Sequence, residues 1–98
     1  MTQWTITSDL FADESAKTGT NANAFGVVGP RGATLSSDDI CKHPEAIAFR
    51  MYDDDGDHVY SGYMVGSNPF APLDDFGAPN FGCTSIRVNV GGSDFVEV

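Results

Sequence analysis

Residues 46–65 read AIAFRMYDDDGDHVYSGYMV, and this stretch decides the fold of the chain. Apolar side chains alternate with more polar ones in both halves of it, which is typical of half-buried strands. The alternating residues are Ile47, Phe49 and Met51 in the first half and Val59, Tyr63 and Val65 in the second. Between the halves, the Asp55-Gly56 step supplies the positive φ angles that a tight hairpin turn demands. We therefore predict an antiparallel hairpin whose tip, residues 53–57, is exposed.

Weaker patterns on both sides of this hairpin extend the sheet. Residues 3–7 place Trp4 and Ile6 between polar neighbours, as a half-buried strand does. Residues 84–90 alternate in the same way, and Gly91-Gly92-Ser93 then turns the chain into residues 95–98 as a second hairpin. The sequence therefore predicts an antiparallel sheet of about five strands.

The remaining segments predict one short helix and long loops. Residues 36–39 read SSDD, which supplies a capping hydroxyl and first-turn carboxylates, and Pro44 stops the helix that begins there. Glycine, proline and asparagine interrupt residues 17–32 and 66–83, so we expect loops in both stretches. A chain of 98 residues has room for one core. We predict a single α+β domain, residues 1–98, that is rich in β structure.

The charge of the chain is strongly acidic and unevenly distributed. The formal net charge is −9, and residues 53–98 hold eight acidic residues against one basic residue, Arg87. Residues 1–52 hold six acidic residues and four basic ones. Such a field repels nucleic acid and anionic membranes, and it attracts basic protein surfaces or cations. We therefore expect a basic protein surface as the partner and no direct contact with nucleic acid.

Two further features suggest a cytoplasmic protein. The sequence has no apolar run of about 18 residues that would span a membrane, and residues 1–11 lack the basic and apolar regions of a signal peptide. Cys41 and Cys83 lie far apart without metal or redox spacing, so we expect both to be free thiols in or near the core.

The acidic tip has the spacing of a calcium loop but not its full pattern. Asp53, Asp55 and Asp57 recur at every second position, as the first ligands of an EF-hand do. However, His58 stands where that loop needs its glycine, and Met64 stands where it needs its bidentate glutamate. We interpret the tip as a solvated acidic turn, with weak calcium binding as an alternative.

Other chemistry-bearing patterns fail on spacing. The Cys and His residues of the chain are Cys41, His43, His58 and Cys83. C-x-H is not a usual zinc-ligand spacing, and the remaining two residues come singly from distant elements. Consecutive carboxylates at 38–39 and 74–75 are on expected surfaces, where pKa values are not tuned for acid–base catalysis. We therefore predict no metal, no cofactor and no enzymatic activity.

Residues 69–81, PFAPLDDFGAPNF, mix apolar side chains with acids on an expected loop. Two interpretations are open. The aromatic and leucine side chains fold back as a roof over one face of the sheet, which a small core needs. Otherwise one or two aromatics, with Phe70 and Phe76 as the candidates, protrude as interface anchors and Asp74 and Asp75 form a steering rim.

A resemblance covers most of the chain. Residues 4–7 (WTIT), 20–23 (TNAN), 49–56 (FRMYDDDG), 60–62 (YSG) and 70–80 (FAPLDDFGAPN) resemble small acidic proteins of unassigned function from actinobacterial genomes and mobile elements. That resemblance implies no known chemistry. By size and charge alone, the chain is also similar to phage anti-CRISPR proteins, some of which imitate DNA, so this second likeness is an analogy about function.

These observations predict a non-enzymatic inhibitor of anti-CRISPR type, encoded by a phage or mobile element and acting in the host cytoplasm. It would bind a basic surface of a nucleic-acid-binding effector, such as a CRISPR effector subunit, by imitating DNA. The candidate partner-binding residues are Asp53, Asp54, Asp55, Asp57, Phe70, Asp74, Asp75 and Phe76. Two alternatives remain: the charge serves only solubility, or the chain is a small metal- or ligand-binding module.

Overall fold

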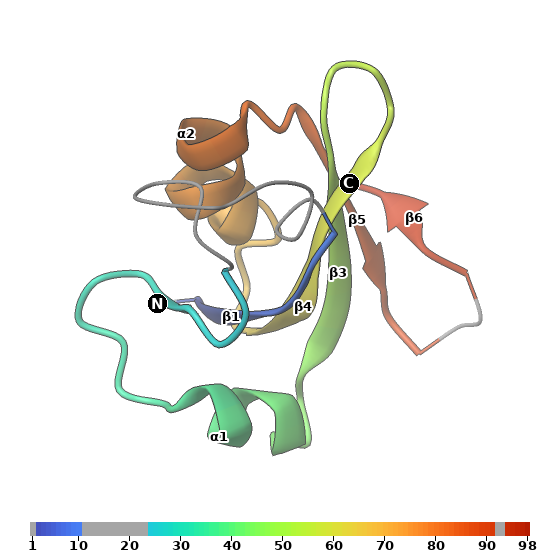
Figure 1. The fold of residues 1–98 in the computed structure, drawn as a ribbon. Coiled ribbons are helices and arrows are strands. Elements are labelled where there is room, and N and C mark those ends of the chain that lie inside the picture. The colour runs from blue at the N-terminus through green and yellow to red at the C-terminus, as the bar shows by residue number, and fades with distance from the viewer. Residues whose placement is uncertain (1, 11–23, 92–93) are drawn as a thin grey trace.

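The computed structural model describes residues 2–10, 24–91 and 94–98, and within them six strands form one antiparallel sheet in the order β2-β1-β4-β3-β5-β6 (Figure 1). The elements of the described chain are β1 (Gln3–Asp9), β2 (Val28–Gly29), α1 (Ser37–Lys42), β3 (Ile47–Tyr52), β4 (His58–Val65), η2 (Leu73–Gly77), α2 (Ala78–Phe81), β5 (Ser85–Asn89) and β6 (Val96–Glu97). The predicted class, a β-rich α+β fold, is confirmed. The sheet has six strands where about five were predicted.

The β3–β4 hairpin is confirmed, including its exposed tip. Phe49 pairs with Gly62 and Met51 with Tyr60 across it. Gly56 has a φ of +84°, and no non-glycine residue of the described chain has a positive φ. The last pair of the hairpin joins Tyr52 to His58, so the turn spans residues 53–57 and is wider than the tight turn predicted from Asp55-Gly56.

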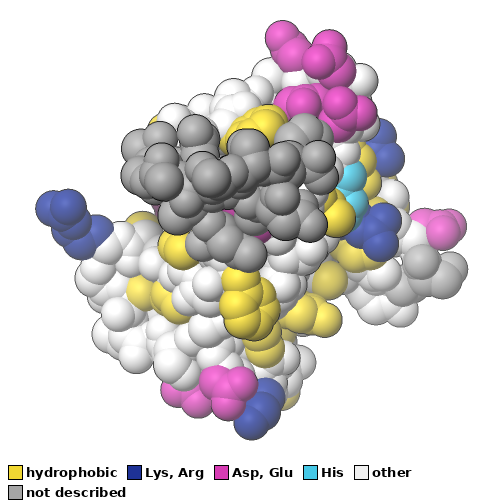
Figure 2. Space-filling model, viewed as in Figure 1, with side chains coloured by type: hydrophobic (Ala, Val, Ile, Leu, Met, Phe, Trp, Pro, Cys, Tyr) yellow, Lys and Arg dark blue, Asp and Glu magenta, His cyan; other side chains and the backbone are white. Residues whose placement is uncertain are grey.

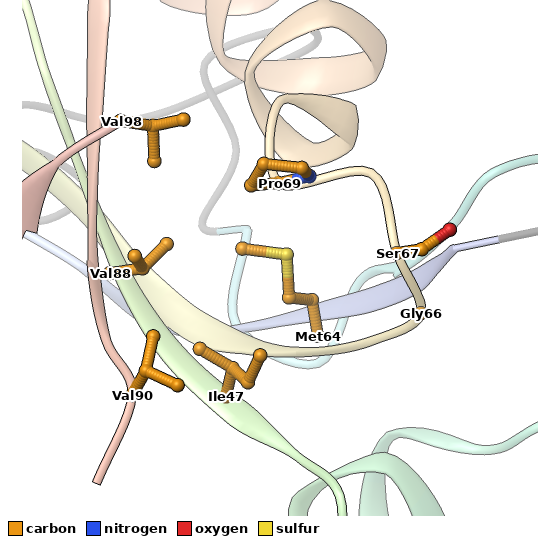
Figure 3. A pocket seen from close by; sticks show the side chains of 8 residues that line it. All are labelled: Ile47, Met64, Gly66, Ser67, Pro69, Val88, Val90 and Val98. Atoms are coloured by element: carbon orange, nitrogen blue, oxygen red, sulfur yellow. The ribbon is translucent and has the colours of Figure 1, made fainter.

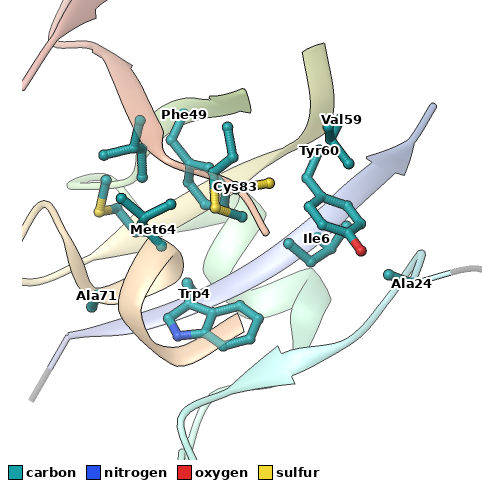
Figure 4. Close-up of a cluster of buried hydrophobic side chains, with 12 residues drawn as sticks. Trp4, Ile6, Ala24, Phe49, Val59, Tyr60, Met64, Ala71 and Cys83 are labelled. Carbon is teal, nitrogen blue, oxygen red and sulfur yellow. The ribbon is translucent and has the colours of Figure 1, made fainter. Parts of the chain in front are cut away.

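One face of the sheet carries the core. Cross-strand partners point to the same side, and on this side Trp4, Ile6, Phe49, Met51 and Met64 are almost fully buried, as Figure 4 shows for several of them. The prediction for β4 has the wrong phase. Its inward residues are Tyr60, Gly62 and Met64, whereas Tyr63 and Val65 are half-buried on the other side. Val59, the third residue of the predicted set, is fully buried as expected.

A helical segment covers the core face, which corrects the prediction of a loop over residues 66–83. Residues 71–81 are helical, with a π-helical turn, η2, leading into α2. Pro72 lies at the start, where its missing N–H costs little, and Pro79 falls where the π turn meets α2. Gly82, at a φ of +73°, ends the helix. The prolines that suggested a loop are thus accommodated at the ends of short helical pieces.

The predicted short helix, α1, is confirmed and packs near the opposite face. The Ser36 side chain accepts a hydrogen bond from the Asp39 backbone N–H and caps the helix. Ile40 is fully buried. The hydroxyl of Ser37 is hydrogen-bonded to that of Thr5, which points away from Trp4 and Ile6 on β1. Helix α1 and the helical segment of residues 71–81 therefore cover different faces of the sheet.

The remaining sequence predictions are tested in part. The expected loop over residues 17–32 contains the short β2, and its first part, residues 17–23, lies outside the described residues. The second hairpin is present, because β5 pairs with β6. Gly92 and Ser93, expected to turn it, lie outside the described residues as well. Both cysteines are free thiols, with Cys41 half-buried and Cys83 buried.

Candidate functional site: the acidic tip and its surroundings

The acidic tip, defined here as Asp53, Asp54, Asp55 and Asp57, is held by its own first carboxylate. Asp53 Oδ1 accepts hydrogen bonds from the backbone N–H groups of Asp55, at 3.0 Å, and Asp57, at 2.9 Å. The backbone closes the same turn, because Asp53 N–H donates to the Asp57 carbonyl at 3.0 Å. Asp54, Asp55 and Asp57 are exposed. The tip therefore presents carboxylates to solvent on a fixed backbone.

The negative charge of the tip has no counter-charge in contact with it among the described residues. In that part of the chain the ion pair present joins Lys42 to Asp38 on α1, away from the tip. The charge of Asp53 acts on the buried Cys83 thiol, whose pKa is raised to about 11, chiefly by burial and then by the Asp53 carboxylate. Cys83 is therefore protonated at neutral pH and is not an activated nucleophile.

The tip also brings three carboxylates close together. Carboxylate oxygens of Asp53, Asp55 and Asp57 lie within 4.8 Å of one another. Oxygen ligands of this kind suit a hard cation such as calcium. The bidentate glutamate that completes a calcium loop is replaced by Met64, which is buried in the core. Exposed acidic groups at such spacing are common, so this geometry does not by itself make a metal site.

The other predicted partner-binding residues lie on the helical segment over the core, except Phe70, which lies in the turn just before it. Asp74 and Asp75 are exposed in the first turn of η2, and Asp75 Oδ2 accepts a hydrogen bond from the indole Nε1 of Trp4 at 3.0 Å. Phe70 is 42% exposed. Phe76 is half-buried and packs on the core. One of the two aromatic candidates is therefore open to solvent and the other contributes to packing.

The packing of Phe76 is specific. Its ring lies 5.4 Å from the Trp4 ring and 5.2 Å from the Tyr60 ring, centroid to centroid. Phe81 contacts the edge of Tyr60 at 6.3 Å and keeps 37% of its surface exposed. Leu73 is buried. Of the two interpretations of residues 69–81, the roof over the sheet describes Leu73 and Phe76, while Phe70 remains available as an anchor.

The acidic side chains are distributed over more than one part of the surface. Figure 2, viewed as Figure 1, shows one acidic group at the end of the molecule where the β3–β4 loop lies. A second group lies at the opposite end, where Figure 1 places α1 with Asp38 and Asp39 in its first turn. Both ends therefore carry acidic side chains on different supports, although Lys42 offsets part of the charge on α1. Removing the same number of charges at each end compares the two.

The structure adds an apolar pocket that sequence reasoning missed. It has a volume of about 340 Å³ and lies beside the hairpin strands, where Ile47, Met64, Val88 and Pro69 surround it together with Val98 (Figure 3). That volume is within the range of small-molecule sites. The alternation of residues 84–90 and 95–98 indicated the apolar face, but not that the helical segment would leave part of it uncovered.

The structure also places two arginines together on the other face. Arg50 of β3 and Arg87 of β5 are direct cross-strand partners. The Arg87 guanidinium lies over the Tyr52 ring, which stacks on the His58 ring. The pKa of His58 is lowered, chiefly by burial and also by Arg50, although its hydrogen bond to the Tyr60 carbonyl opposes the shift. This pair is invisible in the sequence, because its members are far apart along the chain.

Comparison with protein-family models, with curated proteins and with solved structures finds no match to this chain. In the described part of the chain, none of the helices has the length and hydrophobicity needed to cross a lipid bilayer.

Proposed function

We propose that the chain is a non-enzymatic inhibitor of anti-CRISPR type that uses its acidic tip to occupy a basic surface of a nucleic-acid-binding protein. The observation that supports this most is the tip itself, where four carboxylates stand on a turn fixed by Asp53 and have no cation in contact among the described residues. Carboxylates in such an array can replace phosphates in charge-assisted hydrogen bonds to Lys and Arg.

The rigidity of the support favours this function over mere solubility. A solubilising charge needs no defined position, whereas an imitation of phosphates gains affinity when its carboxylates are already placed before binding. Carboxylate oxygens of three of these residues lie within 4.8 Å of one another, so the tip concentrates negative charge as the phosphates of a nucleic acid do. Phe70, 42% exposed, is available just before the helical segment as an apolar anchor, and its carbonyl accepts a hydrogen bond from the Asp74 N–H.

A CRISPR effector is the partner we propose, because its channel binds nucleic acid through Lys and Arg side chains. In this role the chain would act in the cytoplasm of a host cell after expression from a phage or mobile element. Binding through phosphates and their imitations is strongly salt-dependent. The proposal therefore requires that affinity fall steeply with salt and that duplex DNA compete with the protein.

The experiment compares two charge-matched double variants on a purified CRISPR effector complex. Asp54→Asn/Asp55→Asn removes two charges from the tip, and Asp38→Asn/Asp39→Asn removes two from α1 at the other end. Affinity is measured between about 50 and 200 mM salt, with and without duplex DNA. We expect the tip variant to bind at least about tenfold more weakly and the α1 variant to bind as the parent does.

Equal losses in the two variants would show that net charge, and not the tip, drives the binding. Binding that is indifferent to duplex DNA would contradict mimicry, and it would move attention to Phe70 as an apolar anchor. If the protein bound none of the effectors tested, the proposed inhibition of these effectors would be refuted, and the negative charge would be explained by solubility alone.

The alternative of a small ligand-binding module has one observation in its favour, the apolar pocket of about 340 Å³. A small neutral probe such as hexanol tests it. Saturable shifts of the methyl NMR signals of Ile47 and Val88, with no shift at the tip, would favour the ligand-binding module. The possibility of a metal-binding module is tested by measuring the melting temperature at increasing calcium concentration. A ligand that binds only the folded state raises the melting temperature.

A further inference from the structure

The sheet face opposite the core carries a pair of arginines that the acidic character of the protein does not explain. Arg50 and Arg87 stand directly opposite each other on β3 and β5. Like charges in that relationship destabilise an antiparallel pair. A chain with 14 acidic residues and a net charge of −9 has many carboxylates with which to neutralise them. The arrangement therefore calls for a role for the two charges.

Neither guanidinium is neutralised within the described residues. No hydrogen bond or ion pair from Arg50 or Arg87 to an acceptor occurs in that part of the chain, where the ion pair present belongs to Lys42. Glu97 is the cross-strand partner of Arg87 on β6, and its carboxylate makes no ion pair there either. Arg87 is exposed and Arg50 half-buried. Their N–H groups are therefore available to an incoming acceptor.

Aromatic rings hold both guanidiniums in place. Arg50 Cζ lies 4.0 Å from the centroid of the Phe95 ring, and Arg87 Cζ lies 4.5 Å from that of Tyr52. The Tyr52 ring stacks in turn on the His58 ring, and the two ring centroids are 5.2 Å apart. A guanidinium stacked by its face keeps its N–H edge free to donate hydrogen bonds. Stacking also reduces the rotamer freedom that each arginine would lose on binding.

From this arrangement we propose that Arg50 and Arg87 form a binding site for the phosphate group of a small ligand. Two fixed guanidiniums offer two positive charges and several N–H donors, which matches a phosphate dianion in charge and in number of acceptors. A single carboxylate uses one guanidinium fork and leaves the second charge unmatched. This site lies on a different face from the core and its pocket, and it does not depend on the proposed function of the acidic tip.

The test uses the whole protein, labelled with ¹⁵N, and inorganic phosphate or pyrophosphate as the probe at low salt. We expect saturable shifts of the side-chain Nε–Hε signals of Arg50 and Arg87, and no saturable shift for Arg31, an exposed arginine in the loop after β2. Ribose 5-phosphate tests an ester. Tighter binding of the ester identifies an organic phosphate as the ligand, and equal binding identifies free phosphate; both support the site.

Matched variants separate the site from general charge. Arg50→Gln and Arg87→Gln should each weaken pyrophosphate binding at least about tenfold, while Arg31→Gln removes the same charge and should leave affinity within about twofold. Glu97→Gln should strengthen binding, because it removes the carboxylate beside Arg87. Melting temperatures confirm that each variant is folded, and the shifts in the parent protein provide a reading that needs no variant.

Three outcomes would overturn the proposal. The first is the absence of saturable shifts at Arg50 and Arg87 with either probe. The second is an equal loss of affinity in Arg31→Gln, which would mean diffuse attraction and not a site. The third is a competitor that binds at least as tightly as pyrophosphate: succinate of equal affinity would indicate a carboxylate site, and a single-stranded oligonucleotide of higher affinity would indicate a nucleic-acid surface.

Discussion

The indole Nε1 of Trp4 donates a hydrogen bond to Asp75 Oδ2 at 3.0 Å, joining residues 71 positions apart in the sequence. Trp4 is 3% exposed, and its ring also contacts Phe76, the next residue along the helical segment. Asp75 therefore fastens η2 to β1, in addition to any role of its charge at the surface. The chain thus uses one of its exposed acids to satisfy a donor of the core.

Replacing Asp75 by Ala should destabilise the fold by about 1–2 kcal/mol, because the Trp4 N–H loses its acceptor in a part-buried position. Asp74→Ala, in the neighbouring exposed position, is the control and should change the free energy of unfolding by less than about 0.5 kcal/mol. Urea denaturation followed by tryptophan fluorescence measures both. If Asp74→Ala lowered the free energy of unfolding as much as Asp75→Ala, the loss would come from the charge at the start of the helix and not from the hydrogen bond to Trp4.

Gly56→Val should destabilise the β3–β4 hairpin by about 1–2 kcal/mol, since a β-branched residue resists the φ of +84° found there. A Cβ at this position meets nothing within 4 Å, so the cost lies in the backbone. Gly56→Asn, which tolerates the left-handed region better, should cost less than Gly56→Val. Thermal melts rank the two variants, and a parent-like melt for Gly56→Val would refute the turn geometry.

Gly62→Ala should be more damaging than Gly56→Val, for a different reason. A Cβ at Gly62 would lie 1.9 Å from the Thr5 carbonyl oxygen and 2.7 Å from Phe49 Cζ. The first neighbour is backbone of the adjacent strand β1, which cannot move without breaking sheet pairing. We expect a loss of about 3 kcal/mol, the upper end of the usual cost of overpacking. Amide hydrogen exchange in β1 and β4 should rise in this variant, and unchanged protection there would contradict the close approach.

The stability of the fold should decline in alkaline solution through Cys83. Its pKa is raised to about 11 from an ordinary value of 9.0, first by burial and then by the Asp53 carboxylate. Because the folded pKa is the higher one, this contribution is complete below about pH 9 and is lost as pH rises through about 11. Cys83→Ala should therefore show a shallower decline between these pH values in urea denaturation, whatever its stability at neutral pH. A slope equal to that of the parent would contradict this assignment.

The second part of the same pH profile should belong to Tyr60. Burial, then the Asp9 carboxylate and Cys83, raise its pKa to about 12. The folded state again binds the proton more tightly, so stability falls from about pH 10 upward. Tyr60→Phe keeps the ring that packs against Phe76 and removes the titration. A spectrophotometric titration of the phenol should show one tyrosine ionising last in the parent and absent from the variant.

The hairpin was predictable because its information is local. Alternation over residues 47–51 and one glycine at position 56 determine strand, turn and exposed tip without reference to the rest of the chain. The phase of β4 was not predictable in the same way. Tyr60 and Tyr63 are both amphipathic, and the choice between them is made by pairing with Met51 and by the close approach at Gly62.

The helical segment escaped prediction because two prolines and a glycine in eleven positions resemble a loop. Pro72 and Pro79 are tolerated since each falls near the start of a short helical piece, with a π turn between them. Gly77 has a second role that composition does not reveal. A Cβ there would lie 2.5 Å from Met51 Sδ, so glycine lets the helix lie directly on the sheet.

For the candidate sites, sequence reasoning identified the carboxylates and left open their surroundings. Exposure of Asp54 and Asp55 follows from their place in a turn, and the structure agrees. The structural role of Asp75 and the pairing of Arg50 with Arg87 depend on which residues the sheet register brings together. Register is set by long-range pairing, so neither was visible in the alternation of residue types.

Both edges of the sheet are formed by strands of two residues, β2 and β6. An edge of that length offers few unpaired backbone groups to a second chain, although Val96 on β6 is 63% exposed and would otherwise favour such an encounter. Fibril growth requires long edges that add one strand after another. A concentrated stock of this protein should therefore resist cross-β assembly, and extending β6 by designed strand residues would be the direct way to make it polymerise.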